Sequence, residues 1–265
     1  MVRAEPGTIT RVPEPSPPDI VVVGAPRSGT SLACQLLADA GYAFGDRLLP
    51  ASEDNRRGFF EDQDVTECND GLLEPHLDGA VPHRHLAWLA ALSDDVAVTA
   101  RPSDEAAMAG LLPPAPACLK DPRFCYTLDA WRPVLRTGTR FLGVVRHPAE
   151  VATSLRAMFE RQPEYYQPFD VTLAHGFAVW EAMNRRLLGL TGDGPWTVVT
   201  HDGLLDGSAA GALAQLTGRP VSAGSVDRSL HRSRTRNTDV PSSALALHEE
   251  LRRRAAAMPE AVPGG

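Results

Sequence analysis

The stretch 24-GAPRSGTS-31 contains residue types that bind phosphate groups. It follows the short apolar run IVVVG and precedes LACQLLADAG, which is the order of a strand, a glycine-bounded turn and a helix. Backbone N–H groups of such a turn, the helix dipole and the hydroxyls of Thr30 and Ser31 together favour an anion. The sequence therefore predicts an anion-binding loop, although a plain strand–turn–helix connection with a surface arginine fits the same residues.

The charge in this loop is unusual for a nucleoside triphosphate site. Thr30 follows the second glycine, where the phosphate loop of a kinase or NTPase carries a lysine. The cation in the loop is Arg27, whose planar guanidinium suits a fixed oxyanion group. A P-loop kinase or NTPase is therefore the second enzyme interpretation rather than the first.

Two further motifs place polar side chains where strands are expected to end. In CLKDPRF, Lys120 and Arg123 bracket the end of one apolar run. In VVRHPAEVATSL, Arg146 ends another run, and Ser154 follows it by eight residues in a helical pattern. Cations at the carboxyl ends of parallel strands point toward one shared ligand, although solvated charges at strand ends fit Lys120 and Arg146 as well.

The elements that must position these residues follow an alternating pattern. Short apolar runs predict strands near 20–25, 117–121, 140–147 and 195–201. Helical patterns follow them: the first ends at Gly41, one begins at Pro148, and longer ones cover about 171–190 and 244–258. This alternation predicts an α/β protein with a P-loop-like three-layer fold, in which helices flank a central parallel sheet.

Composition sets the broad class of the protein. The chain has 265 residues, is 43% apolar and carries a net charge of −7, which disfavours a nucleic-acid surface. Its apolar runs are shorter than the ~18–20 residues of a membrane span, and we expect a cytoplasmic protein that is not bound to a membrane. The four cysteines form no CxxC pair and indicate reduced thiols.

The predicted organisation is one domain after an arm. Residues 1–18 contain five prolines and no periodicity, which predicts a disordered arm. Residues 19–265 are expected to form a single domain. Within it, residues 43–116 are irregular and too long for a plain loop, and the basic segment 228–236 is either a solvated loop or a mobile lid.

Taken together, GAPRSGTS, LKDPR and VVRHPAEVATSL resemble the sulfotransferases that use 3′-phosphoadenosine 5′-phosphosulfate (PAPS), particularly small bacterial members. The motifs have that family's order and compatible spacing, and weaker similarity extends to 55–62, 179–188 and 198–207. The resemblance implies PAPS as donor, 3′-phosphoadenosine 5′-phosphate (PAP) as product, and no metal. His76, His83 and His85 also lack the spacing of a metal site.

The resemblance implies a role for each matching residue. The 5′-phosphosulfate would be held by Arg27, Ser28, Gly29, Thr30 and Ser31. Arg146 and Ser154 would hold the 3′-phosphate, which distinguishes this nucleotide from ATP. Lys120 matches a strand-end lysine near the leaving oxygen or the sulfuryl group, where it and Arg27 would neutralise developing charge.

Two positions depart from the family pattern. Pro122 stands where some relatives place a catalytic histidine, and His201 stands where a tyrosine often precedes an acidic pair. Because related enzymes without that histidine can use a carboxylate from the region of 53–62, Glu61 is the first candidate for the base. Phe59 and Phe60 are expected to raise its pKa. Glu53, His83 and His85 remain competitors.

The expected reaction is transfer of a sulfuryl group to a hydroxyl or amine of a small-molecule acceptor, a metabolite. Residues 43–116 are the expected insert that forms the acceptor site, with walls from Phe59, Phe60, Trp88, His83 and His85. The alternatives are a P-loop kinase or NTPase and a non-catalytic nucleotide-binding protein. A homo-oligomer is compatible with the sequence.

Overall fold

The computed structural model of the chain describes residues 16–52, 58–77, 84–166, 169–192, 196–222 and 238–256. The predictions for Glu53, for His83, for the basic segment 228–236 and for most of the N-terminal arm lie outside the described residues. The interpretation of 1–18 as disordered stays a prediction.

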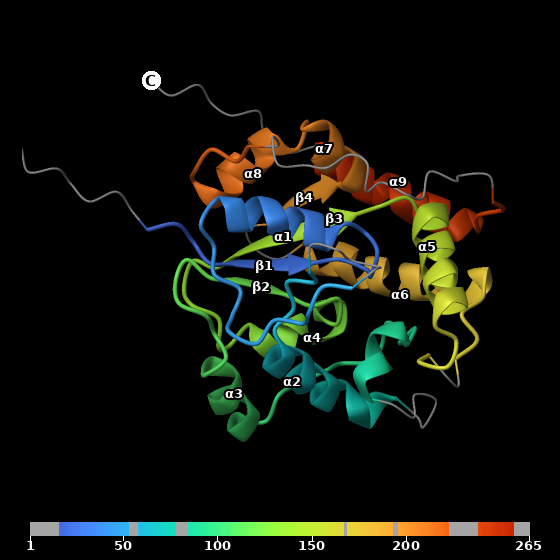
Figure 1. Cartoon of the computed structure of the whole chain (residues 1–265), viewed down its shortest axis with the longest axis horizontal. Helices are drawn as coiled ribbons and strands as arrows, with labels where there is room; N and C mark the ends of the chain where they lie inside the picture. Colours follow the sequence, from blue (N-terminus) through green and yellow to red (C-terminus); the bar gives the residue numbers. More distant parts are fainter. Residues whose placement is uncertain are drawn as a thin grey trace, which may run out of the picture.

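Four parallel strands form the sheet, in the spatial order β2-β1-β3-β4. They are β1 (Ile20–Val23), β2 (Cys118–Lys120), β3 (Arg140–Val145) and β4 (Trp196–Thr200). The predicted parallel sheet is thus confirmed, and each strand lies inside its predicted range. Because all four strands run in the same direction, their carboxyl ends meet at one edge (Figure 1).

Helices fill the intervals between and after the strands. The α-helices are α1 (Thr30–Asp39), α2 (Gln63–Leu73), α3 (Pro102–Ala109), α4 (Phe124–Trp131), α5 (Pro148–Arg161), α6 (Leu173–Leu190), α7 (His201–Asp206), α8 (Ala210–Thr217) and α9 (Ser242–Ala256). Two short 3-10 helices, η1 (Glu74–His76) and η2 (Arg84–Leu89), follow α2.

Alternation of side chains along β1 divides the core into two apolar layers. Ile20 and Val22 pack with residues of α1 and α8 on one face, and Val21 and Val23 pack with residues of α4, α5, α6 and α9 on the other. All four strand residues are buried. The result is the predicted three-layer α/β arrangement of helices, sheet and helices (Figure 1).

Several element boundaries follow the predicted local signals. Gly41 has φ +90° after the end of α1, and α5 begins at Pro148. The region 43–116 is more ordered than predicted, because it contains α2 and α3. Asp62 caps α2 by accepting from the N–H groups of Asp64 and Val65, a start signal that the sequence interpretation did not use.

The four cysteines are free thiols, as predicted, and Cys34, Cys118 and Cys125 are buried. Burial raises the pKa of the Cys125 thiol to about 12, so it stays protonated at neutral pH. Among the described helices, none has the length and apolarity needed to cross a membrane.

The first residue after β1 lies against the neighbouring strand, which generates a stability prediction. A Cβ added at Gly24 would lie 2.6 Å from the Val144 carbonyl oxygen of β3. Because that oxygen belongs to the backbone, Gly24→Ala is expected to lower the free energy of unfolding by about 1–3 kcal/mol. Urea denaturation measures this change.

Gly189→Ala is the matched control, because a Cβ there meets nothing within 4 Å and the residue lies in α6. It is expected to leave stability unchanged or to raise it by about 0.5–1 kcal/mol. Equal unfolding midpoints for Gly24→Ala and wild type would contradict the close approach of β1 and β3.

Candidate active site

The carboxyl edge of the sheet brings the predicted site residues into one row. Lys120 ends β2, the loop 24–31 follows β1, Arg146 follows β3 and His201 follows β4. Neighbouring strands are ~4.8 Å apart, so the ends of β2 and β3 are separated by about 10 Å with the loop between them. The row has the dimensions of a site for one extended ligand with several charged groups.

The loop that follows β1 has the conformation of an anion site. Arg27 has φ +66° and Gly29 has φ +95°, both in the left-handed region. The Gly29 carbonyl accepts from the N–H groups of Leu32 and Ala33. These bonds start α1 immediately after the turn. The N-terminus of a helix presents backbone N–H groups and the positive end of the helix dipole, which together favour a bound anion.

Position 29 favours glycine for two reasons, its positive φ angle and the close approach of His201. A Cβ at Gly29 would lie 2.5 Å from Cδ2 of His201. The imidazole of His201, which is 7% exposed, therefore packs against the phosphate-loop backbone. His201 replaces the tyrosine expected from the family pattern, and the structure places its ring in the same row as the other site residues.

Arg27, Arg146 and Ser154 are brought together by direct contacts. Nε of Arg27 donates to the Ser154 hydroxyl at 3.0 Å. A terminal nitrogen of Arg146 donates to the Arg27 carbonyl at 3.1 Å. Residues 127 positions apart in the chain are thus in direct contact. The sequence interpretation assigned Arg27 to the 5′-phosphosulfate and Arg146 with Ser154 to the 3′-phosphate, and these assignments stay predictions.

Two residues orient Arg146 through contacts that the sequence interpretation did not predict. The Glu150 carboxylate accepts from Nε of Arg146 at 2.9 Å. The Trp180 indole donates to the Arg146 carbonyl at 3.1 Å, and its ring is fully buried. The spacing of four residues between Arg146 and Glu150 was a usable signal, but the Trp180 contact depends on tertiary packing.

Lys120 and Glu61 form a buried ion pair. Nζ of Lys120 contacts Oε1 of Glu61, and the two side chains are 4% and 10% exposed. Burial raises the pKa of the Glu61 carboxyl, while the Lys120 ammonium acts in the opposite direction. The structure therefore joins Lys120 and Glu61, two of the three residues that the sequence interpretation named as catalytic, and the raised pKa of Glu61 suits a base.

Glu61 reaches this position because its segment runs beside the phosphate loop. The Ser31 hydroxyl donates to the Phe59 carbonyl at 3.3 Å, and the Glu61 carbonyl accepts from the Leu49 N–H at 2.8 Å. The Phe60 ring packs on Phe44, with ring centroids 5.1 Å apart. These contacts hold the backbone on both sides of Glu61.

Arg123 has a different role from its neighbour Lys120. It is 2% exposed, and its guanidinium pairs with the carboxylates of Asp70 and Asp121 and donates to the His85 carbonyl at 2.9 Å. A buried arginine with two carboxylates and a carbonyl is a structural centre that ties α2 and η2 to the start of α4.

Two of the residues predicted to line the acceptor site, His85 and Trp88, lie in η2. His85 is exposed and its ring lies 5.4 Å from that of Tyr165, whereas the half-buried Trp88 ring contacts Tyr166.

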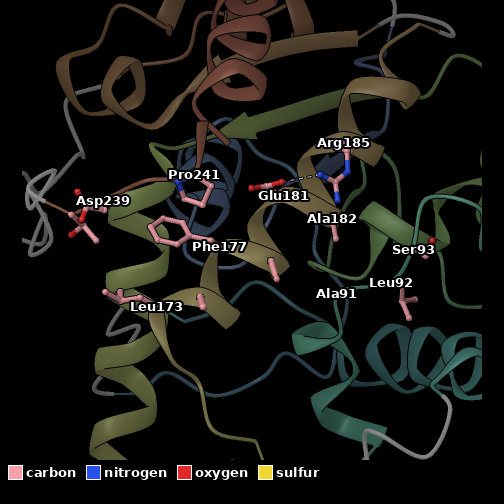
Figure 2. A pocket seen from close by; sticks show the side chains of 13 residues that line it. Ala91, Leu92, Ser93, Leu173, Phe177, Glu181, Ala182, Arg185, Asp239 and Pro241 are labelled. Atoms are coloured by element: carbon pink, nitrogen blue, oxygen red, sulfur yellow. Dashed lines mark hydrogen bonds and ion pairs between the residues drawn. The ribbon is translucent and has the colours of Figure 1, made fainter. Parts of the chain in front are cut away.

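A separate cavity of about 810 Å³ lies along α6, lined by residues that include Phe177, Glu181 and Arg185 (Figure 2). Arg27, Lys120, Arg146, Ser154 and Glu61 are not among the residues that line that cavity.

One group in the described part of the chain has the spacing of a metal site, namely Glu150, His201 and Asp202, with ligand atoms within 4.8 Å of one another. Glu150 already binds Arg146. We therefore assign this carboxylate to positioning Arg146.

Comparison with known proteins agrees with this geometry. The model of the sulfotransferase family matches residues 18–195. Among curated proteins, none matches the chain.

Solved structures show the same fold. The sulfotransferase domain of the olefin synthase from Synechococcus PCC 7002 has a TM-score of 0.52 at 17% identity, over 91% of this chain and 97% of that domain. The sulfotransferase domain from the curacin biosynthetic pathway has a TM-score of 0.54 at 14% identity, over 89% of this chain and 98% of that domain. Because the family model spans most of the chain, the protein belongs to the sulfotransferase family.

Proposed function

We propose that this protein transfers a sulfuryl group from PAPS to a hydroxyl or amine of a small-molecule acceptor. The observation that carries the proposal is the buried Lys120–Glu61 pair at the same sheet edge as the Arg27, Arg146 and Ser154 cluster. A phosphate clamp and a base beside a cation are the parts that sulfuryl transfer needs.

The residues present fit the proposed donor. The Ser28 hydroxyl is fully buried in the loop and has no hydrogen-bond partner within the described part of the chain. Burying an unsatisfied hydroxyl costs free energy, so the Ser28 hydroxyl suits a site in which it donates a hydrogen bond to a bound anion. Arg146 and Ser154 would hold the 3′-phosphate, and Arg27 with the loop N–H groups would hold the 5′-phosphosulfate.

When bound, the donor supplies a sulfuryl group on a phosphate leaving group. Glu61 would accept the proton of the acceptor hydroxyl or amine as the acceptor forms its bond to sulfur. Lys120 and Arg27 would neutralise the charge that develops on the transferring group and on the leaving phosphate. Because Lys120 also pairs with Glu61, it would keep that carboxylate oriented before transfer.

The nature of the acceptor is supported by the comparisons and by charge. The two sulfotransferase domains compared above come from an olefin synthase and from the curacin biosynthetic pathway, so we propose a biosynthetic metabolite as acceptor. A net charge of −7 supports a partner other than nucleic acid. We propose that the reaction takes place in the cytoplasm and away from membranes, in a monomer or a homo-oligomer.

The direct test is incubation of the protein with PAPS and a metabolite library, followed by mass spectrometry. A sulfotransferase releases PAP and adds a sulfuryl group to a library member, a gain of ~80 Da by the stoichiometry of the reaction. A non-catalytic nucleotide-binding protein would bind PAP without consuming PAPS. A kinase would instead consume ATP, and either result would overturn the proposal.

Arg146→Ala is expected to weaken PAP binding by about 1.5–3 kcal/mol, the range for hydrogen bonds to charged groups. Binding of adenosine 5′-phosphosulfate, which lacks the 3′-phosphate, is expected to change much less. Calorimetric titration with both ligands measures the difference. Arg140→Ala, at the opposite end of β3, is the control, and equal losses for both ligands in Arg146→Ala would remove Arg146 from the 3′-phosphate.

Lys120→Met is expected to lower turnover far more than PAP affinity, because the Lys120 charge acts mainly on the transition state. Steady-state kinetics gives the turnover number, and PAP titration of the same preparation gives the dissociation constant for PAP. Unchanged PAP affinity also shows that the variant folds. If affinity falls as much as turnover, Lys120 belongs to donor binding.

Glu61→Gln is expected to retain PAP binding and lower turnover by roughly 10²–10⁴-fold, as for a lost general base. Since the Glu61 pKa is raised and only its deprotonated form is a base, wild-type turnover should rise with pH through a midpoint above the ordinary glutamate value of ~4.3. The variant should lack this limb.

The competing candidates for the general base are tested in parallel with the variants His83→Ala, His85→Ala and Glu53→Gln. Near-normal turnover of Glu61→Gln, with loss in one of these three, would transfer the role to that residue.

A further inference from the structure

The cavity along α6 has no part in the proposed reaction. Its volume of about 810 Å³ lies within the roughly 300–1,000 Å³ that small-molecule sites occupy. Besides α6, the loop after η2 and the segment before α9 supply its lining (Figure 2). The apolar part of the lining consists of Leu92, Leu173, Phe177, Pro241 and four alanines. The cavity therefore has the size and the apolar walls of a ligand site.

Different faces of α6 border the cavity and the core. Phe177, Glu181 and Arg185 line the cavity and recur every four residues, which places them along one face of the helix. Trp180 and Asn184 are fully buried and are not among the lining residues. The Trp180 indole donates to the Arg146 carbonyl. The face that supports the proposed donor site is thus separate from the face that borders the cavity.

The charged side chains of the lining are two acids and one base. Glu181 and Asp239 carry two negative charges and Arg185 carries one positive charge, which leaves a net charge of −1. Arg185 already binds two carboxylates, Glu181 at 2.9 Å and Asp94 at 3.0 Å. Because two anions balance this guanidinium, the lining favours a cationic ligand over an anionic one.

The Glu181 carboxylate is held in place at the apolar wall. One of its oxygens accepts from Arg185, and the other accepts from the Ser243 hydroxyl at 2.9 Å. Its side chain is 15% exposed, so an added cation would interact with it more strongly than with a carboxylate in bulk water. Figure 2 shows Glu181 between the Phe177 ring and Arg185. An amine at Glu181 would therefore have an apolar surface beside it.

We propose that the α6 cavity is a second small-molecule site, and that its ligand is an organic ammonium with an apolar body. The ammonium group lies at Glu181, and the apolar body covers Phe177, Leu173 and Pro241. Burial of apolar area supplies most of the affinity, and the acidic side chains supply the preference for a cation. This inference goes beyond the proposed function and does not depend on it, because the proposed donor and catalytic residues take no part.

The experiment is a fluorescence titration with dansylcadaverine, in which a five-carbon chain joins an apolar naphthalene sulfonamide to a primary amine. Two analogues keep the ring and the chain but replace the ammonium by a methyl group, in N-hexyldansylamide, or by a carboxylate, in N-dansyl-6-aminohexanoate. Wild-type protein is expected to bind dansylcadaverine about three- to tenfold more tightly than the neutral analogue, and the carboxylate most weakly. Saturating PAP should not displace dansylcadaverine.

Glu181→Gln removes the charge and keeps the shape of the side chain. It is expected to weaken dansylcadaverine binding about three- to tenfold and to leave N-hexyldansylamide within about twofold of wild type. Asp239→Asn, at an exposed residue, should weaken dansylcadaverine by a smaller factor. Glu160→Gln is the matched control, because Glu160 pairs with Arg156 four residues away in α5 and does not line the cavity. It makes the same change in net charge and should leave binding unchanged.

Ala178→Trp places an indole in the cavity at an exposed position and is expected to weaken all three probes at least about fivefold. Unfolding midpoints from circular dichroism show whether each variant keeps the fold. The proposal is overturned if wild type shows no saturable binding of dansylcadaverine, or if folded Ala178→Trp binds it like wild type. Equal affinities of Glu181→Gln and Glu160→Gln for dansylcadaverine, or its displacement by PAP, would also overturn the proposal.

Discussion

The hydrogen bond from Arg146 to the Arg27 carbonyl joins the end of β3 to the loop after β1, and the proposed donor site depends on it. Arg27 has a left-handed backbone that non-glycine residues adopt at a cost. The bond from Arg146 and the bond from Nε of Arg27 to Ser154 hold that conformation from two sides. Glu150 and Trp180 in turn fix Arg146, so residues from α5 and α6 support a loop that belongs to β1.

The Lys120–Glu61 pair is the second constraint, and it is costly. Two charges removed from water lose hydration that their mutual attraction only partly restores, so a buried pair is weak evidence for stability. The position of the pair at the end of β2, beside the phosphate loop, favours a role in function rather than in stability. The same burial that destabilises the carboxylate raises the pKa of Glu61 and makes it a stronger base.

The sequence was sufficient for features that depend on local physics. The four strands, the glycine after α1, and the proline that begins α5 follow from apolar runs and backbone preferences. The approach of Arg146 to the Arg27 loop also followed, because parallel strands end at one edge. The place of Ser154, which lies in α5, came from the resemblance to sulfotransferases.

Features that depend on tertiary contacts could not be predicted in the same way. Trp180 looks like an ordinary core residue until its indole is seen at the Arg146 carbonyl. Arg123 lies three residues after Lys120, yet it pairs with Asp70 on another helix. The ring contact between Tyr165 and His85 of η2 likewise joins residues about 80 positions apart in the chain.

Binding of PAP and of ADP to the wild-type protein, compared by calorimetry without magnesium, tests the central claim most directly. The claim is that the carboxyl edge of the sheet recognises one nucleotide through a 3′-phosphate and a 5′-phosphate at separate cationic groups. It predicts that PAP binds at least about tenfold more tightly than ADP, since each charged hydrogen bond to the 3′-phosphate contributes about 1.5–3 kcal/mol. Equal affinities, or tighter binding of ADP, would contradict it.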